Sequence, residues 1–300
     1  MRKVEQPLVS ICTLVYNHEP YLRACLDGFV MQRTNFAFEV LVHDDASTDG
    51  SAEIIREYTE KYPEIFKPIY QHENQYSKGV WVNATFQYPR AKGKYIALCE
   101  GDDYWTDPMK LQHQVDFMES HPDYSLCFHN AMVLNERLEV KERIQSFCHL
   151  NHSQTISTEH IISEWCIPTA SILFRRESFE KFELPRFFSG DYTLELALAS
   201  VGKVYYIDRY MSVYRLNNGG VSSKISVEKW ATQLFALLEW FDNLTSHQYH
   251  NEIELRIREV KKNTRYITLK DKSMLLPMIC MPKYTLKMLR QKLSKLSLVG

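Results

Sequence analysis

Apolar runs of strand length alternate with amphipathic segments of helix length along the chain up to His121-Pro122. The run Leu8–Tyr16 is almost continuously apolar and β-branched, which is typical of a strand buried on both faces. Pro20 then begins a segment whose apolar residues have helical spacing. The predicted strands are Leu8–Tyr16, Phe38–Val42, Phe66–Tyr70 and Tyr95–Cys99, and the predicted helices follow Pro20 and Ser51 and cover Trp81–Ala91 and Met109–Glu119.

This order of elements indicates a parallel sheet covered by helices on both faces, as in a Rossmann-like α/β domain. The second half of the chain is less regular. Its predicted strands are Tyr124–Leu134, Ala170–Phe174 and Val204–Tyr214, its predicted helices are Asp191–Val201, Val227–Phe241 and Glu252–Leu269, and Ser146–Thr158 is predicted to be a loop. The sequence contains neither the Gly-x-Gly-x-x-Gly fingerprint of dinucleotide-binding domains nor a P-loop motif.

Two of the predicted strands end in adjacent carboxylates: Asp44-Asp45 follows the second strand, and Asp102-Asp103 follows the fourth. An isolated pair of this kind is explained more simply by a polar loop that caps the next helix. In one parallel sheet, however, both pairs lie at the edge where ligands of α/β sheets bind. Carboxylate oxygens suit Mg²⁺ or Mn²⁺, which commonly binds substrate phosphates as well. The two pairs together therefore predict a metal–diphosphate site.

Four motifs carry a resemblance to a known family. They are Val-Ser-Ile-Cys-Thr-Leu-Val-Tyr-Asn (9–17), His-Asp-Asp-Ala-Ser-Thr-Asp-Gly-Ser (43–51), Gly-Lys-Tyr-Ile-Ala-Leu-Cys-Glu-Gly-Asp-Asp-Tyr-Trp (93–105) and Ser-Gly-Asp-Tyr-Thr-Leu-Glu-Leu (189–196). In this order the chain resembles the family 2 glycosyltransferases of the GT-A fold, over about residues 7–223. The resemblance implies a mostly parallel sheet flanked by helices. It also implies a catalytic domain over 1–223, with a nucleotide-binding half to about 122 and an acceptor half from about 123, and a helical C-terminal extension over 224–300.

The resemblance also implies roles for individual residues of the nucleotide and metal sites. Tyr16 would stack on the nucleobase, Asp45 would accept the imide N–H of a uracil- or thymine-like base, and Lys78 would reach the diphosphate. Asp103 would bind Mg²⁺ or Mn²⁺, and Asp102 would face the ribose or the metal. The implied nucleotide-binding residues are Leu14, Tyr16, Asp45, Lys78 and Asp102.

On the acceptor side, the resemblance implies that Asp191 is the base that deprotonates the acceptor hydroxyl, in a single displacement with inversion at the anomeric carbon. The alternative for Asp191 is an N-cap of the following helix. Trp165 is expected either to stack on an acceptor sugar or to pack in the core. Many relatives have a His where this chain has Asn217, so either the metal site is looser or the loop with Gly219-Gly220 closes over the substrate.

We therefore predict an inverting, metal-dependent glycosyltransferase of bacterial cell-surface polysaccharide synthesis. Its donor would be a UDP- or dTDP-type sugar, and its acceptor a glycan or lipid-linked glycan. One alternative is a nucleotidyltransferase, which usually carries a Gly-rich basic loop where this chain has Tyr16-Asn17-His18-Glu19. The other alternative is a scaffold that binds nucleotide sugars without turnover.

The composition is that of a globular protein, with 300 residues, of which 45% are hydrophobic and 24% charged. A formal net charge of −1 gives no argument for nucleic acid binding. The seven Cys include no Cys-x-x-Cys pair, which indicates a reducing compartment. The N-terminus lacks an apolar signal region, and Met274–Met281 is far shorter than the ~20 residues that span a bilayer. These features predict a cytoplasmic protein.

Two further patterns bear on membrane contact and on zinc binding. After Asp271 the charged residues are all basic, and four leucines share one helical face: Leu286, Leu289, Leu293 and Leu296. Such a helix is expected either to contact the inner face of a membrane or to dock on the catalytic domain. His149-x-x-His152 lacks Cys or carboxylate neighbours at zinc spacing, so it is not predicted to bind zinc.

Overall fold

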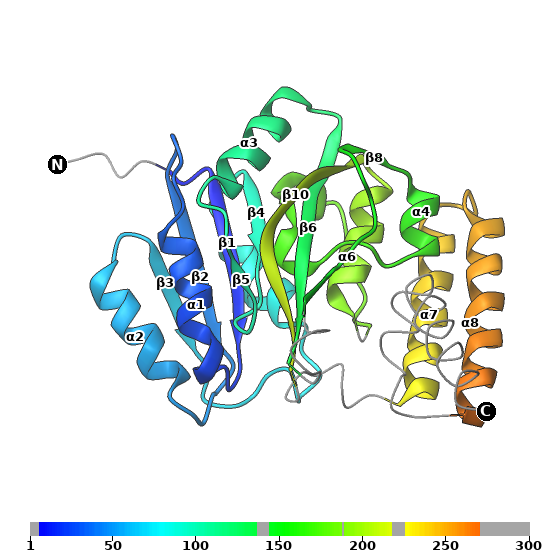
Figure 1. The fold of residues 1–300 in the computed structure, drawn as a ribbon, viewed down its shortest axis with the longest axis horizontal. Helices are drawn as coiled ribbons and strands as arrows, with labels where there is room; N and C mark the ends of the chain where they lie inside the picture. The colour runs from blue at the N-terminus through cyan, green and yellow to red at the C-terminus, as the bar shows by residue number, and fades with distance from the viewer. Residues whose placement is uncertain (1–5, 137–143, 188, 218–225, 271–300) are drawn as a thin grey trace, which may run out of the picture. The chain divides into compact units, whose positions relative to one another are not determined.

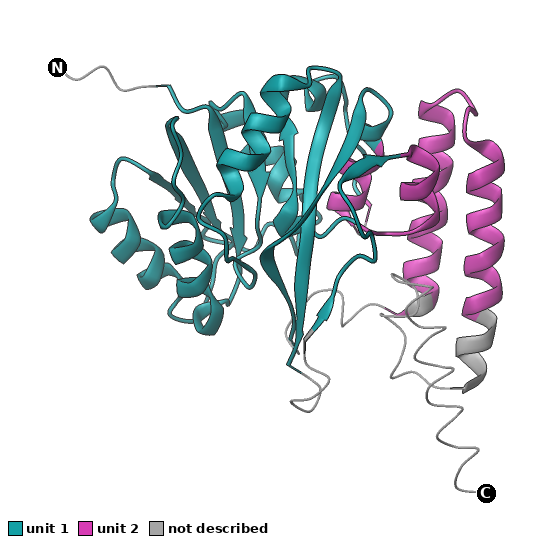
Figure 2. Cartoon of the chain, turned by 45° about the horizontal axis from the view of Figure 1, so that its top comes forward, with its two compact units in different colours: residues 1–156, 167–186, 197–217 teal, residues 157–166, 187–196, 218–300 magenta. Residues whose placement is uncertain are grey.

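The computed structural model describes residues 6–136, 144–187, 189–217 and 226–270. The chain forms two compact units, which are coloured separately in Figure 2. Unit 1 comprises Met1–Ile156, Ile167–Arg186 and Ala197–Asn217, and unit 2 comprises Ser157–Cys166, Phe187–Leu196 and Asn218–Gly300. The chain therefore passes from one unit to the other several times.

The strands of the described residues all belong to unit 1 and form one ten-stranded sheet (Figure 1). Its order is β3-β2-β1-β4-β9-β6-β10-β5, while β7 pairs with β6 and β8 pairs with β10. The strands are β1 Val9–Val15, β2 Phe38–Asp44, β3 Phe66–Tyr70, β4 Tyr95–Leu98, β5 Tyr104–Trp105, β6 Tyr124–Asn135, β7 Ile144–Ser146, β8 Gln154–Ile156, β9 Leu173–Arg175 and β10 Lys203–Leu216.

The N-terminal half of the sheet is parallel, as predicted. β1 lies between β2 and β4 and pairs in parallel with both, and β2 pairs in parallel with β3. All but one residue of β1 are buried, which agrees with its continuous apolar run. Because the three central strands point the same way, the residues that follow Asp44 and Leu98 emerge at one edge of the sheet.

The second half of the sheet mixes directions. β9 is antiparallel to both β4 and β6, whereas the long strands β6 and β10 are parallel. Two elements differ from the sequence-based expectation. The predicted loop Ser146–Thr158 contains β8, and the residues after Asp103 form the two-residue strand β5, which pairs antiparallel with β10. Both strands depend on pairing with distant residues, which short sequence patterns do not reveal.

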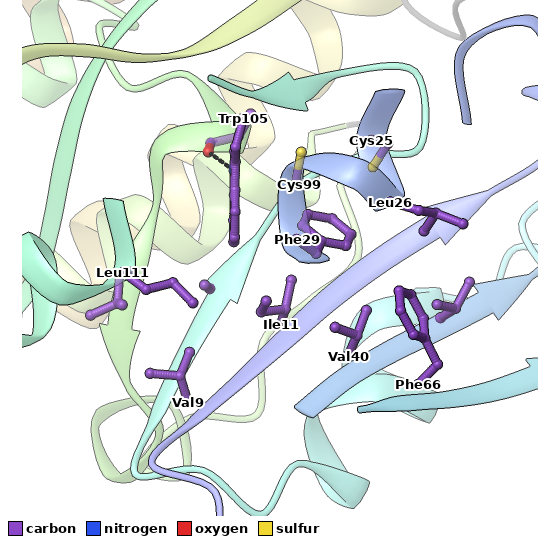
Figure 3. Packing of buried hydrophobic residues seen from close by; sticks show 14 of the residues in the cluster. Val9, Ile11, Cys25, Leu26, Phe29, Val40, Phe66, Cys99, Trp105 and Leu111 are labelled. Atoms are coloured by element: carbon purple, nitrogen blue, oxygen red, sulfur yellow. Dashed lines mark hydrogen bonds between the residues drawn. The ribbon is translucent and has the colours of Figure 1, made fainter. Parts of the chain in front are cut away.

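Helices pack on the sheet of unit 1 around the core drawn in Figure 3. Phe29 of α1 contacts Trp105 of β5 edge to face, with ring centroids 4.8 Å apart, and Trp105 Nε1 donates to the Ala170 carbonyl at 2.8 Å. A Cβ atom at Gly28 would lie 3.0 Å from Trp105 N, so the glycine allows α1 to approach β5 closely. The helices of this unit are α1 Glu19–Val30, α2 Ser51–Lys61, α3 Lys110–Ser120 and α5 Arg176–Phe179.

The predicted helix Trp81–Ala91 is formed only as short, irregular turns. A π-helical turn, η1, covers Asn83–Gln87, and a 3-10 turn, η2, covers Tyr88–Arg90. Pro89 explains the interruption, because it lacks the N–H that an α-helix would use. The predicted strand Ala170–Phe174 likewise begins with a 3-10 turn, η4 Thr169–Ser171, before β9.

Unit 2 is helical. It contains α4 Thr158–Ser163, α7 Val227–Leu244 and α8 His250–Lys270, together with the first part of α6 Gly190–Ala199. α7 and α8 lie side by side, and α4 packs against α8 (Figure 2). No helix among the described residues is both long enough and apolar enough to cross a bilayer. The basic pattern after Asp271 lies outside the described residues, so the predicted membrane contact stays a prediction.

Candidate active site

The ends of β1, β2 and β4 are joined by backbone hydrogen bonds. Asp45 N donates to the Val15 carbonyl at 2.8 Å, and Gly101 N donates to the Leu14 carbonyl at 2.9 Å. A Cβ atom at Gly101 would lie 3.0 Å from that carbonyl, so only glycine fits this close approach without displacement. The structure therefore brings Leu14 and both acidic strand ends to one edge of unit 1, as the sequence predicted.

Asp45 lies at this edge, directly after β2. It is only 4% exposed, and its two carboxylate oxygens accept from Gln75 N at 2.8 Å and Tyr76 N at 3.0 Å. The carboxylate thus fixes the loop that follows β3. Each oxygen has more than one acceptor position, so Asp45 can still accept one further N–H from a ligand.

Two residues at this edge have left-handed backbone conformations. Asn17, after β1, has φ 56°, and Ala46, after β2, has φ 62°. Such conformations are uncommon for residues other than glycine and cluster at functional sites. The Asn17 side chain links the two turns, because its Oδ1 accepts from Thr48 N at 2.8 Å. Tyr16 precedes Asn17 and is 46% exposed, so its ring is open to a ligand.

Lys78 lies in the turn after the loop that Asp45 holds. Its ammonium group forms an ion pair with Glu73, and both side chains are exposed. Lys78 is therefore close in sequence to Gln75 and Tyr76, which donate to Asp45, but the described contacts do not connect it to Asp102 or Asp103.

Asp102 and Asp103 differ in exposure. Asp103 is 2% exposed, and its Oδ1 accepts from Arg215 N at 2.8 Å. Burial, reinforced by the charges of Asp102 and Glu100, raises the pKa of Asp103 well above 3.8 despite that hydrogen bond. Asp102 is partly exposed, and its Oδ2 accepts from Asn217 Nδ2 at 2.9 Å.

This donor set fits a divalent cation. Two adjacent carboxylates, one of them buried, repel each other unless positive charge is placed beside them. Oxygen donors of this kind suit Mg²⁺ or Mn²⁺ better than softer metals. Asp102 and Asp103 are therefore the residues that would hold such an ion.

Asn217 has a contact that the sequence did not predict. It is 5% exposed, and its amide Nδ2 donates to Asp102 rather than presenting its carbonyl to the same carboxylate. At this position the side chain therefore orients Asp102. The loop residues Gly219-Gly220 lie outside the described residues.

Two residues that the sequence-based prediction did not include lie beside the acidic pair. The Arg215 guanidinium lies 5.1 and 4.6 Å from the ring centroids of Tyr21 and Tyr104, and it forms an ion pair with Glu136 at 3.8 Å. His18 Nδ1 lies 2.7 Å from where a Cβ atom of Gly101 would be, and burial lowers the pKa of His18 against the charges of Asp102 and Asp49. The sequence did contain a signal for His18, because this residue follows shortly after the predicted first strand. Arg215 reaches the site through the β5–β10 pairing, which has no local signal.

Asp191 lies in the first turn of α6, in unit 2. Its Oδ1 accepts from Ser189 Oγ at 3.1 Å, and the same hydroxyl oxygen accepts from Tyr192 N at 3.3 Å. Ser189 therefore caps the helix. The alternative that Asp191 serves only as the N-cap is not supported, because Ser189 fills that position.

Glu195 lies one turn after Asp191, on the same face of α6. It is fully buried, and burial raises its pKa well above 4.5, with a smaller rise from the charge of Asp191 and a lowering effect of Trp165. Trp165 is partly buried, and its indole nitrogen lies against this helix rather than in solvent. These contacts make Trp165 a packing neighbour of the Asp191 helix. They leave its role toward an acceptor sugar a prediction.

Comparison with solved structures identifies the class of fold. S. aureus TarS, in complex with UDP-GlcNAc, superposes with a TM-score of 0.68 at 17% identity, over 90% of this chain and 78% of that one. The Pyrobaculum calidifontis mannosyltransferase PcManGT, in complex with GDP-Man and Mn²⁺, gives 0.57 at 15% identity, over 96% and 81%. The fold is therefore that of the GT-A glycosyltransferases, as predicted.

The family model described as glycosyl transferase family 2 matches residues 10–182, and the chain belongs to this family. An uncharacterised Mycobacterium tuberculosis protein is 37% identical over 213 residues, which are 71% of this chain and 60% of that protein. The match thus spans less than two thirds of the mycobacterial protein. TuaG of Bacillus subtilis, named as a candidate teichuronic acid biosynthesis glycosyltransferase, is 28% identical over 79% of this chain and 87% of its own length.

Proposed function

We propose that this protein is an inverting, metal-dependent glycosyltransferase that transfers a sugar from a nucleoside diphosphate donor to a hydroxyl group of a glycan or lipid-linked glycan. The observation that carries the proposal is the buried carboxylate of Asp103, held by Arg215 N beside Asp102 at the strand edge of a family 2 chain.

The donor would bind along the edge formed by β1, β2 and β4. Tyr16 would stack on the base, and Asp45 would accept its imide N–H while keeping the loop at Gln75 and Tyr76 in place. A base with such an N–H favours a UDP- or dTDP-type donor. Binding of UDP-GlcNAc by TarS supports this donor class, and binding of GDP-Man by PcManGT shows that GT-A folds also accept another base.

The chemical step needs one base and one means of neutralising the leaving group. Asp191 would accept the proton of the acceptor hydroxyl as its oxygen bonds to the anomeric carbon. The bond from that carbon to the diphosphate oxygen breaks at the same time, and the nucleoside diphosphate leaves with the electron pair. Attack and departure on opposite faces give inversion. A Mg²⁺ or Mn²⁺ ion held by Asp102 and Asp103 would supply positive charge for the diphosphate.

Residues of unit 1 would prepare the diphosphate end of the site. Arg215, beside Tyr21 and Tyr104, would add a second positive group, and its backbone N–H already fixes Asp103. Asn217 would hold Asp102 in one orientation through its amide group. The likeness to TuaG favours an acceptor from bacterial cell-surface polysaccharide synthesis, which would place the reaction at the cytoplasmic side of the membrane.

The test measures the unfolding temperature of the full chain with a panel of nucleotide sugars, with and without Mn²⁺ or Mg²⁺. A UDP or dTDP sugar at 100 times its Kd should raise Tm by about 5 °C or more, and only with metal. Asp103→Asn should lose the effect of metal, because it keeps an oxygen for Arg215 N but removes the charge.

Asp116→Asn, at an exposed position of α3, is the matched control and should respond like the wild type. Stabilisation that persists in Asp103→Asn and ignores metal contradicts the proposed site. A donor that stabilises the wild type but is neither hydrolysed nor transferred favours the non-catalytic scaffold instead.

A further inference from the structure

The turn between α7 and α8 gathers three side chains with metal-binding atoms. Asp242 lies in the last turn of α7, His247 lies in the connecting turn, and His250 is the first residue of α8. Asp242 Oδ2 lies 3.0 Å from His247 Nδ1 and 2.8 Å from His250 Nδ1. One donor atom from each residue lies within 4.8 Å of the other two.

The arrangement is close to that of a tetrahedral site. Zinc–nitrogen and zinc–oxygen bonds of about 2.0–2.1 Å place neighbouring ligand atoms about 3.3 Å apart. The two imidazole–carboxylate distances therefore need to lengthen by only a few tenths of an ångström, and the two imidazole nitrogens, which lie within 4.8 Å of each other, also need to reach this spacing. Their ring planes are 83° apart, so both nitrogens can face one point without stacking of the rings.

Asp242 needs positive charge at this place. The residue is only 7% exposed, and its Oδ1 is buried without a hydrogen-bond partner among the described residues. It also lies at the C-terminal end of α7, where the helix dipole disfavours a negative charge. Nothing in this turn except the two histidines faces its carboxylate in the described contacts.

The backbone of the turn is specialised as well. Ser246 and His247 have φ values of 51° and 63°, and two consecutive left-handed residues other than glycine are uncommon. With this conformation the chain turns back, so that His247 lies beside Asp242. The backbone N of His247 donates to the Asp242 carbonyl at 2.8 Å. The turn is therefore shaped so that His247 shares one carboxylate with His250.

We propose that Asp242, His247 and His250 form a site for a zinc-class divalent cation that clamps α7 to α8. Two imidazole nitrogens and one carboxylate oxygen are a donor set of Zn²⁺, and a water would complete the tetrahedron. This chemistry differs from the oxygen-only donors at Asp102 and Asp103, which suit Mg²⁺ or Mn²⁺. The site is independent of the proposed glycosyl transfer and would act on the stability of unit 2.

The test uses the full chain after removal of metal with a chelator, followed by dialysis against Zn²⁺ and measurement of bound metal. The wild type should bind one zinc ion more than His250→Gln, and zinc should raise its Tm by about 5 °C at 100 times the Kd. Co²⁺ should give the strong visible absorption of a tetrahedral nitrogen-containing site. An oxygen-bound octahedral Co²⁺ ion absorbs only weakly.

His152→Gln is the matched control, because His149-x-x-His152 has the same spacing as His247-x-x-His250 and lies in unit 1. It should bind zinc like the wild type. His247→Gln tests the second imidazole if His250→Gln lowers expression. Equal zinc content and equal Tm in the wild type and both α7–α8 variants overturn the proposal, and then the histidines serve only as hydrogen-bond partners of Asp242.

Discussion

The two units bury carboxylates by different means. In unit 1, Asp45 and Asp103 accept hydrogen bonds from backbone N–H groups of segments far along the chain, at Gln75, Tyr76 and Arg215. In unit 2, Glu195 is buried one helical turn after Asp191. Burial raises the pKa of Glu195, and Trp165 lowers it by a smaller amount.

The difference is between orienting a carboxylate with backbone hydrogen bonds and shifting its pKa by burial. Backbone donors hold the carboxylates of Asp45 and Asp103 in one orientation before any ligand arrives, and this does not depend on the rotamer of a partner side chain. The unit 2 pair instead puts a carboxylate that favours its neutral form next to the proposed base. The carboxylates of Asp45 and Asp103 are thus held in place by hydrogen bonds, whereas burial disfavours the charged form of Glu195.

The largest expected effect concerns the proposed base. Asp191→Asn should lower kcat by about 10²- to 10⁴-fold, because the amide cannot take the acceptor proton. Its affinity for the donor should change by less than about twofold, since donor recognition is assigned to unit 1. Steady-state kinetics and calorimetric titration of the nucleotide measure the two quantities. Unchanged kcat in a variant that unfolds at the wild-type temperature rules out Asp191 as the base.

A smaller effect is expected at the nucleobase end. Asp45→Asn places an N–H₂ group against Gln75 N or Tyr76 N and also removes the charged acceptor proposed for the imide N–H of the base, and the loss of that hydrogen bond to a charged group costs about 1.5–3 kcal/mol of binding. The Kd for uridine diphosphate should therefore rise by about 10- to 100-fold. Calorimetric titration measures this, with the exposed Asp116→Asn as control. If Asp45→Asn binds as tightly as the control, Asp45 does not organise the nucleotide site.

The smallest effect is a pH dependence of stability from Glu195. The folded-state pKa of Glu195 lies above its unfolded value of about 4.5, so the folded state binds the proton more tightly. Stability is consequently lost as the pH rises from about 4.5 through the folded-state pKa. Glu195→Gln removes this loss and should unfold a few degrees above the wild type at pH 8 but not at pH 4.5.

Thermal unfolding from pH 4.5 to 8 measures the difference, and Glu239→Gln at an exposed position of α7 is the control. If the Tm values of Glu195→Gln and the wild type change in parallel over this range, folding does not raise the pKa of Glu195.

The N-terminal half of the fold was largely predictable from the sequence. β1, β2, β3 and β4 begin and end within a few residues of the predicted positions, because buried parallel strands have nearly continuous apolar runs. The acidic strand ends could be placed at one edge for the same reason, since parallel neighbours bring their ends together. At that edge Asp45 N donates to the Val15 carbonyl, and Gly101 N, next to Asp102, donates to the Leu14 carbonyl.

The remaining parts of the site depend on contacts between distant residues. Arg215 and Asn217 reach Asp103 and Asp102 across more than a hundred residues of sequence, through the end of β10. The cluster that we propose as a cation site is missed for another reason: Asp242, His247 and His250 are polar residues in or beside a turn, and the left-handed conformations of that turn have no local sequence signal. From the sequence alone, Trp165 could either stack on an acceptor sugar or pack in the core. Its contact with the buried Glu195 is a packing contact and does not test the first role.

The interleaving of the two units limits how the protein can be divided. A cut at residue 217 removes α7 and α8 but leaves Ser157–Cys166 and Phe187–Leu196, which belong to the same compact unit. α4 would then lose its partner α8, and the segment that carries Asp191 would lose the buried Arg256 near Tyr192. The C-terminal helices are consequently not an exchangeable module. Chimaeras between relatives should swap all three segments of unit 2 together.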